Sequence, residues 1–265
     1  MRATYRDKNN KDYWTKRWSD IDADLAMLNN EKYPLKYSKM LIQDKKDKMI
    51  LEAGCGAGRI LRYYHNNGYN IIGIDFIKEA IKKLLIADKS LKAQYEDIRN
   101  LSFSNDFFDY VLAFGLYHNF KSGPDLQKSI SETRRVLKTD GYVCASFRAD
   151  NLQNKIVDYL HLKKQKNKNK KDLYFHKLNL TKEEYKELFQ SNGFKVEKLF
   201  AVENMPFLYK FNFFRSNNQK SFNENKARIE GYQLSLLGKI LQKFLIKFFP
   251  DQFCNIYLII AKKIN

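Results

Sequence analysis

Three glycines at alternate positions form the part of the sequence best suited to bind a nucleotide. Gly54, Gly56 and Gly58 follow an apolar run over 49–53, and a helical pattern of apolar residues begins directly after them. Glycine allows positive φ and lets the backbone approach a ligand without a Cβ clash. The amides at a helix start point toward whatever lies over the turn. This order predicts a nucleotide-type site, although a simple tight turn between strand and helix gives the same pattern.

Two acids narrow the kind of nucleotide. Asp75 ends a second apolar strand over 70–75, the position at which dinucleotide-type sites bind the ribose diol. Glu52 stands just before the first glycine, where a carboxylate suits a cationic cofactor and repels a pyrophosphate. The residues leave NAD and S-adenosylmethionine (SAM) as alternatives, and Glu52 favours SAM.

The elements that must position these residues alternate between strands and helices. Apolar runs predict strands, and residues at helical spacing predict the helices between them. Alternation of this kind predicts a parallel sheet covered by helices on both faces. The strands are expected at 49–53, 70–75, 91–96, 108–114, 142–147, 194–202 and 255–261, and the helices at 58–67, 77–88, 124–137 and 181–192.

The composition excludes several classes of protein. With 44% hydrophobic and 15% aromatic residues among 265, the chain can bury a large core, which argues against global disorder. It has neither an apolar run long enough to span a membrane nor the apolar core of a signal peptide. The three cysteines, Cys55, Cys144 and Cys254, lie far apart. They support neither disulfides nor a metal site, so we expect no metal and a cytoplasmic location.

The charge is strongly positive and unevenly distributed. The net charge is +18; residues 1–149 carry a net of +7 and residues 150–265 a net of +11. A lysine-rich solvated surface explains such a balance, but the asymmetry also suggests that the C-terminal part contacts an anionic partner. The block Lys163–Lys171, with six lysines in nine residues, is typical of a solvated loop.

Two regions outside the alternation carry aromatic residues. Within residues 1–47, Tyr13, Trp14, Trp18 and Ile21 recur at helical spacing, which predicts a helix packed on the core or a lid over the cofactor. Before the last strand, residues 234–249 combine a stripe of leucine, isoleucine and phenylalanine with lysines on the other side of the helix (Lys239, Lys243 and Lys247). That helix could complete the core as a lid or contact a membrane surface.

With the glycine turn, Asp75, Asp97–Ile98 and the fourth strand in this order, the chain resembles a class I SAM-dependent methyltransferase, type 11/25-like and of the small-molecule branch. The resemblance covers roughly residues 48–201 and the final strand. It implies an α/β fold: a three-layer Rossmann-like sandwich with a seven-stranded, mostly parallel sheet and an antiparallel last strand. We divide the chain into an N-terminal helical lid, 1–47, and a SAM-binding domain, 48–265, with insertions at 148–178 and 203–252.

The resemblance also implies where SAM binds. The acid of the first motif would lie near the amino and sulfonium groups, the glycines would let the backbone wrap the cofactor, and Asp75 would bind both ribose hydroxyls. Phe76 would flank the adenine, and Asp97 and Ile98 would bind its edge. The predicted cofactor residues are Glu52, Gly54, Cys55, Gly56, Gly58, Asp75, Phe76, Asp97, Ile98, Ala113, Phe114 and Gly115, with Tyr13 and Trp18 from the lid.

Catalytic residues are expected after the fourth strand. His118 is the histidine closest to the predicted site and could act as a base, or it could simply hydrogen-bond the loop. Tyr117 is a second candidate. Relatives often carry two histidines in a row here, and this chain has Asn119 at the second position.

The leading hypothesis is methyl transfer from SAM to an oxygen or carbon of a small acceptor, lipid-linked or of saccharide type. The alternatives are a tRNA methyltransferase, for which no RNA-binding module is recognised, and a non-catalytic SAM-binding partner at a membrane surface. The predicted partners are the acceptor and, through 234–249, the inner face of a membrane; nucleic acid is the less favoured partner.

Overall fold

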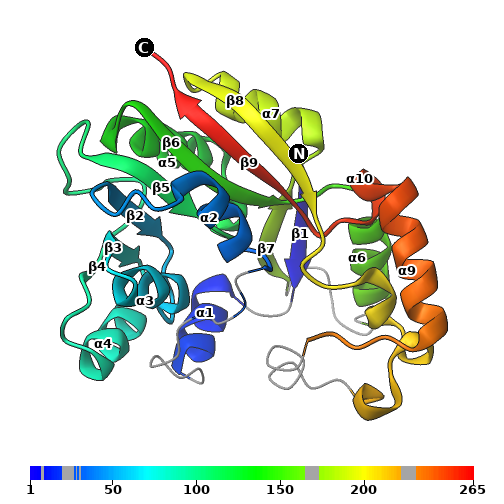
Figure 1. The fold of residues 1–265 in the computed structure, drawn as a ribbon. Coiled ribbons are helices and arrows are strands. Elements are labelled where there is room, and N and C mark those ends of the chain that lie inside the picture. The colour runs from blue at the N-terminus through cyan, green and yellow to red at the C-terminus, as the bar shows by residue number, and fades with distance from the viewer. Residues whose placement is uncertain (7–8, 20–26, 28, 30, 165–172, 222–230) are drawn as a thin grey trace.

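A seven-stranded sheet forms the centre of the fold (Figure 1). The computed structural model describes residues 1–6, 9–19, 27, 29, 31–164, 173–221 and 231–265. The strand order is β4-β3-β2-β5-β6-β9-β8. Strands β2 to β6 pair in parallel, whereas β9 runs antiparallel to both β6 and β8. The predicted sheet, with its antiparallel last strand, is confirmed.

The elements of this sheet follow the predicted alternation closely. The strands are β2 Met49–Ala53, β3 Asn70–Asp75, β4 Ala93–Tyr95, β5 Phe108–Ala113, β6 Leu137–Arg148, β8 Phe194–Val202 and β9 Ile256–Lys263. The helices between them are α3 Arg59–Asn66, α4 Lys78–Ala87, α5 Gly123–Val136 and α7 Lys182–Gln190. Strand β6 begins five residues earlier than the expected start at 142, directly at the end of α5.

Helices cover both faces of the sheet and produce three layers. Neighbouring residues on one strand point to opposite faces, so Leu51 belongs to one apolar cluster and Ile50 to the other. The first cluster includes residues of α5 and α7. The second includes residues of α3, α4 and α2 Leu35–Ile42. Fully buried aliphatic side chains in both clusters stabilise the sheet that carries the site.

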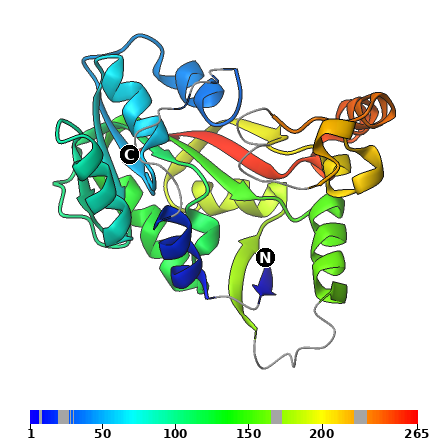
Figure 2. The same ribbon diagram turned by 90° about the horizontal axis from the view of Figure 1, so that it is seen from below.

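The N-terminal region is only partly helical. Helices α1 Asn10–Ser19 and α2 were expected within residues 1–47, but the chain begins with a strand, β1 Arg2–Arg6. This strand pairs antiparallel with β7 Tyr174–Asn179 in a separate two-stranded sheet, visible beside the N-terminus in Figure 2. The predicted helical lid over 1–47 did not include this strand, because its partner lies far away in the sequence. Ile21 of the predicted stripe lies outside the described residues.

The insertion at 148–178 contains regular structure beside its lysine block, for which we expected a solvated loop. Helix α6 Leu152–Lys164 and strand β7 lie within or across it. Of the lysine block, only Lys163 and Lys164 belong to the described residues. Arg2 joins this insertion to β1 through ion pairs to Asp150, at 2.6 Å, and Asp158, at 2.9 Å.

The insertion at 203–252 packs as a small unit beside α6. It contains three short 3₁₀ turns, Phe207–Lys210, Asn212–Phe214 and Asn217–Gln219, followed by α9 Leu236–Phe248 and α10 Pro250–Phe253. A third apolar cluster joins these turns to Val157 of α6. Among the described residues, no helix has the length and apolar character needed to cross a membrane.

Candidate active site

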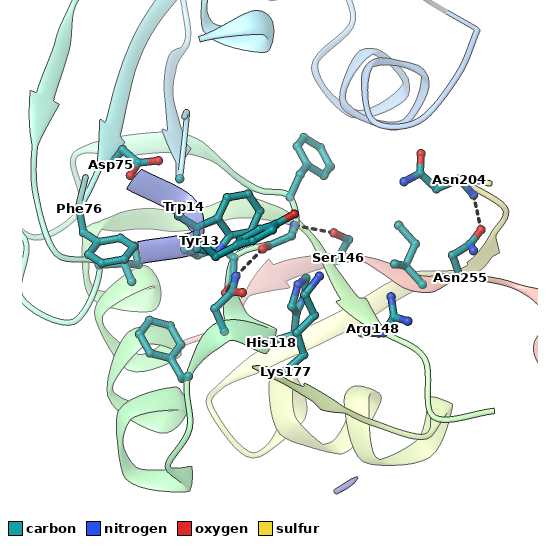
Figure 3. A pocket seen from close by; sticks show the side chains of 18 of the residues that line it. Tyr13, Trp14, Asp75, Phe76, His118, Ser146, Arg148, Lys177, Asn204 and Asn255 are labelled. Carbon is teal, nitrogen blue, oxygen red and sulfur yellow. Dashed lines mark hydrogen bonds between the residues drawn. The ribbon is translucent and has the colours of Figure 1, made fainter. Parts of the chain in front are cut away.

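A cavity of about 630 Å³ opens at the carboxyl ends of the parallel strands, where open α/β sheets bind their ligands. Its walls come from α1, the ends of β3, β5 and β6, the turn Tyr117–Asn119 and the segment around Asn204 and Met205. Figure 3 shows Asp75 and Phe76 at one end and Arg148, Asn204 and Asn255 at the other. We name these the cofactor end and the acceptor end.

Asp75 organises the cofactor end. Its carboxylate accepts hydrogen bonds from the backbone amides of Gly56 and Ile77, both at 2.9 Å. The side chain is buried, and this burial raises its pKa above the ordinary value despite the amides that favour the charged form. One carboxylate therefore joins the end of β3 to the glycine turn and also borders the cavity, and its role at the ribose stays a prediction.

The glycine turn has the backbone geometry that only glycine adopts without strain. Gly54, Gly56 and Gly58 have φ of +78°, +52° and +70°. A Cβ at Gly56 would lie 2.4 Å from the indole of Trp18, so α1 covers the turn directly. Trp18 stacks on Trp14 at 5.4 Å between ring centroids, and both rings border the cavity with Tyr13. This placement is what the lid hypothesis for Tyr13 and Trp18 requires.

Asp97 lies on the cavity wall next to Ile98, as predicted, but its carboxylate is already engaged. Arg99 forms an ion pair with Asp97 at 2.6 Å and a second with Asp125 at 3.0 Å. Hydrogen bonds from Arg99 hold the pKa of Asp97 below its ordinary value, so this acid is ionised at neutral pH. A contact to the adenine would have to use the remaining lone pairs, and this role stays a prediction.

Glu52 does not border the cavity, contrary to what we expected of an acid facing a cationic cofactor. Its carboxyl is buried beneath the start of α3, where the Leu61 amide hydrogen-bonds to it and Oε2 has no partner. Burial raises the pKa of Glu52 to about 8. A helix start has free amides that attract an acid, so local helix geometry explains this residue.

Several other predicted cofactor residues lie behind the turn instead of on the cavity wall. The side chain of Cys55 is buried against Gly73, and Ala113 is fully buried in the core. A Cβ at Gly58 would lie 2.4 Å from Leu84 of α4; its small size therefore serves helix packing. Gly54, Phe76, Phe114 and Gly115 do border the cavity.

Tyr117 does not reach the cavity either. Its side chain is fully buried, its hydroxyl lies 2.7 Å from Thr133 Oγ1 of α5, and its ring meets Phe189 edge-on. Burial raises its pKa above the ordinary value. The hypothesis of a catalytic Tyr117 is therefore wrong, since a core tyrosine of this kind contributes packing and one buried hydrogen bond.

His118 points into the middle of the cavity, between the two ends (Figure 3). Its side chain is only 6% exposed, and its Nδ1 has no hydrogen-bond partner among the described residues. Burial, with the nearby Lys177, Arg148 and His176, holds the pKa of His118 well below its ordinary value. The ring is therefore neutral at pH 7, the form that can accept a proton.

The acceptor end contains residues that the sequence did not identify. Arg148 ends β6, and Lys177 comes from β7. Tyr33 hydrogen-bonds Ser146 at 2.9 Å, and the Gly115 amide donates to the same Ser146 hydroxyl at 2.9 Å. Arg148 stands one residue beyond the predicted strand and Lys177 near the end of the predicted insertion 148–178, so only their places in the tertiary structure bring them to one cavity.

Comparisons with known proteins agree with this fold. Residues 51–145 match the family described as methyltransferase domain. The methyltransferase in a Haloferax volcanii complex with the Trm112 methyltransferase activator has a TM-score of 0.62 at 12% identity, covering 96% of both chains. A SAM-dependent methyltransferase from Methanosarcina mazei has a TM-score of 0.58 at 20% identity, covering 88% of this chain and 98% of that one. At these identities the likeness is one of fold.

A curated relative of known activity matches a shorter part of the chain. The Arabidopsis thaliana tRNA (carboxymethyluridine(34)-5-O)-methyltransferase is 32% identical over 95 residues, which are 36% of this chain and 22% of that protein. For the first relatives found, the match covers 22% to 54% of the relative's own length.

Fold, cavity and family match agree on one class: residues 51–145 match the methyltransferase-domain family, and the fold is that of class I SAM-dependent methyltransferases. SAM is the cofactor of this class, and the residues present here fit that molecule. Gly54 brings the positive-φ backbone of the glycine turn to the cavity wall, and Asp75 offers a buried carboxylate at a strand end. Asn119 Oδ1, buried and without a hydrogen-bond partner among the described residues, can accept from the SAM ammonium group.

Proposed function

We propose that this chain transfers the methyl group of SAM to an oxygen of a small hydroxylated acceptor, with a carbon atom as the alternative acceptor. The observation that carries the proposal is the single cavity that joins Asp75 and Gly54 to His118 and Arg148. Its volume of about 630 Å³ lies within the range of small-molecule sites, about 300 to 1,000 Å³. Cofactor and acceptor can therefore meet in one cavity.

SAM supplies a methyl group already activated on a sulfonium, so the protein's task is to position the acceptor and take its proton. His118 stands between the two ends as a buried, neutral ring. It is the residue placed to accept the proton of a hydroxyl as the new bond between oxygen and methyl carbon forms. Tyr33 and Ser146, hydrogen-bonded to each other beside Gly115, border the same space and can orient the hydroxyl.

The test measures methyl transfer from labelled SAM to small-molecule fractions of a cell extract. For His118→Asn we expect turnover to fall about 100-fold, with SAM affinity changed by less than about twofold. Because His118 is buried, circular dichroism must show an intact fold. A wild-type rate in His118→Asn would remove the base from the proposal. Tight SAM binding without transfer to any fraction would favour the non-catalytic SAM-binding partner.

A tRNA acceptor is the second candidate, and it is supported by the name of the Arabidopsis relative and by the charge of +18. Phosphate contacts make nucleic-acid binding weaken steeply with salt. A titration of total tRNA between about 50 and 200 mM salt distinguishes the two acceptors. Binding and methylation of tRNA with a steep salt dependence would replace the small acceptor.

We also propose that α9 rests on an anionic membrane surface. A lid helix would turn its apolar side chains toward the protein, and α9 turns most of them toward solvent. Gln242 is the residue that faces inward, where its side chain donates a hydrogen bond to Glu203 and accepts one from the Leu208 amide. Leu236 is 76% exposed, Ile240 58% and Phe244 52%. The other exposed apolar residues of this face are Leu237, Leu241, Phe248 and Phe249. Figure 1 shows α9 at the outer edge of the molecule.

The lysines beside this apolar face favour an anionic lipid surface as its partner. Lys239, Lys243 and Lys247 recur every four residues along the same helix and are exposed, so they border the apolar side chains. An apolar face with a lysine edge matches the interfacial depth and charge of anionic lipid. Through Gln242 the helix is tied to the segment that borders the acceptor end, so a docked α9 would place the cavity near a lipid-linked acceptor.

Flotation tests this contact with vesicles of phosphatidylcholine alone and with about 30% phosphatidylglycerol. We expect the protein to float only with the anionic vesicles, and Ile240→Ser with Phe244→Ser to abolish flotation. Lys186→Glu on α7 is the matched surface control and should float normally. Equal flotation of the double variant would overturn the proposal. A concentration-dependent dimer that the double variant loses would assign the face to a second copy of the chain.

A further inference from the structure

We propose that the acceptor carries an anionic group, a carboxylate or a phosphate, which binds between Arg148 and Lys177 beside His118. The inference rests on the proposed methyl transfer and adds the chemical class of the acceptor. Its basis is the contrast between cations on the wall of the acceptor end and the carboxylates of that region, which are bound elsewhere.

Arg148 is the central residue of this site. It lies at the end of β6, where its side chain borders the cavity (Figure 3). The two nearby carboxylates, Asp150 and Asp158, both pair with Arg2, at 2.6 and 2.9 Å. Within the described ranges, the Arg148 guanidinium makes neither a hydrogen bond nor an ion pair. A half-buried guanidinium stays charged, and its planar donors match a carboxylate or phosphate in two-point contact.

Lys177 brings a second positive charge to the same space from a different element, β7. Figure 3 shows its side chain beside that of His118, on which it also acts electrostatically. Two cations from separate strands border one cavity, so an anion bound between them would be attracted by both positive charges.

Two buried polar atoms in the same cavity, one of them on His118, also lack partners among the described residues. His118 Nδ1 belongs to a side chain that is 6% exposed, and Gln153 Oε1 to one that is 1% exposed. An orphaned buried polar atom is costly unless a ligand satisfies it. Both atoms can accept hydrogen bonds from hydroxyl groups. These two atoms, together with Arg148 and Lys177, would fit an acceptor that carries hydroxyl groups and one negatively charged group.

An anionic group here would also assist the proposed base. The positive charges of Lys177 and Arg148 contribute to the low pKa of His118. A bound anion offsets these charges and so raises the proton affinity of His118 when the acceptor is in place. The ring would then become a stronger base only in the loaded complex.

The experiment titrates the complex with S-adenosylhomocysteine, the demethylated cofactor, with inorganic phosphate and, separately, with acetate. The only two tryptophans of the chain, Trp14 and Trp18, both border the cavity and report binding by fluorescence; phosphorus NMR gives an independent measure. We expect Arg148→Gln to weaken anion binding at least about tenfold, Arg148→Lys to recover part of it, and Lys186→Gln on α7 to leave it unchanged.

The outcomes separate this inference from the proposed function. Tighter binding of phosphate than of acetate would indicate a phosphate-bearing acceptor, and tighter binding of acetate would indicate a carboxylate. Undiminished anion binding in Arg148→Gln, or an equal loss in Lys186→Gln, would overturn the inference while cofactor binding remains. Failure of the wild-type protein to bind S-adenosylhomocysteine would instead contradict the proposed methyl transfer itself.

Discussion

The two ends of the cavity differ in how the chain builds them and in charge. The cofactor end comes from the ends of neighbouring parallel strands, with Asp75 and Asp97 as acids and Arg99 already paired with acids. The acceptor end combines β6, β7 and the segment around Asn204, with Arg148 and Lys177 as cations. A cationic cofactor and an anionic acceptor would each meet the opposite charge. The difference in charge would therefore direct each ligand to its own end of the cavity.

The largest expected effect concerns Asp75, which belongs to the cofactor end alone. Asp75→Ala removes the carboxylate at the end of β3 and the acceptor for the Gly56 amide. We expect SAM affinity to fall at least 100-fold, about 3 kcal/mol, measured by calorimetry. Glu187→Ala, an exposed acid on α7, is the control.

Phosphate binding at the acceptor end should persist in Asp75→Ala if the two ends act independently. A parallel loss of both ligands would show that the variant damages the whole cavity, and circular dichroism would then separate this from local unfolding. Unchanged SAM affinity would remove the ribose assignment.

Much of the cofactor end could be predicted from the sequence because it depends on local order. An apolar strand followed by glycines, and a second strand ending in Asp75, place these residues at one sheet edge through the topology alone. The direction in which individual side chains point could not be predicted from this local order. Glu52 points toward the start of α3 and Tyr117 toward Thr133. In each case tertiary packing determines whether the side chain faces the core or the cavity.

The acceptor end could not be predicted for a different reason. Lys177 reaches the cavity because β7 pairs with β1, across about 170 residues of sequence, and no local pattern indicates such a pair. Likewise, the apolar stripe of α9 was visible in the sequence, but its outward direction depends on Gln242 and its contacts to Glu203 and Leu208. Long-range pairing thus determines the region in which the acceptor is expected.

Glu52→Gln tests whether the Glu52 carboxyl belongs to the cofactor end or only to the packing beneath α3. The folded pKa is about 8 against an ordinary value of 4.5, so folding requires Glu52 to bind a proton that the unfolded chain releases above that ordinary value. Stability from this group is present at low pH and is lost as pH rises from the unfolded pKa toward 8. We expect Glu52→Gln to match wild type near pH 4 and to exceed it by about 4 kcal/mol at pH 7.5.

Urea unfolding at several pH values measures this difference in the free energy of unfolding. SAM affinity is measured on the same samples and should change far less than in Asp75→Ala. A drop comparable to that of Asp75→Ala would place the Glu52 carboxyl at the cofactor after all, and a stability curve parallel to wild type would contradict the raised pKa.

The smallest expected effect is that of Tyr117→Phe, which tests whether the residue before His118 belongs to the core or to the cavity. The variant keeps the ring against Phe189 and removes only the hydroxyl bonded to Thr133 at 2.7 Å. We expect stability to fall by about 1 kcal/mol, measured by urea unfolding, and both methyl transfer and SAM affinity to stay at wild-type levels. The adjacent His118→Asn is the paired variant, with the opposite profile. If Tyr117→Phe lowered turnover as strongly, the two neighbours would share one catalytic role, and the division between core and cavity at this turn would be wrong.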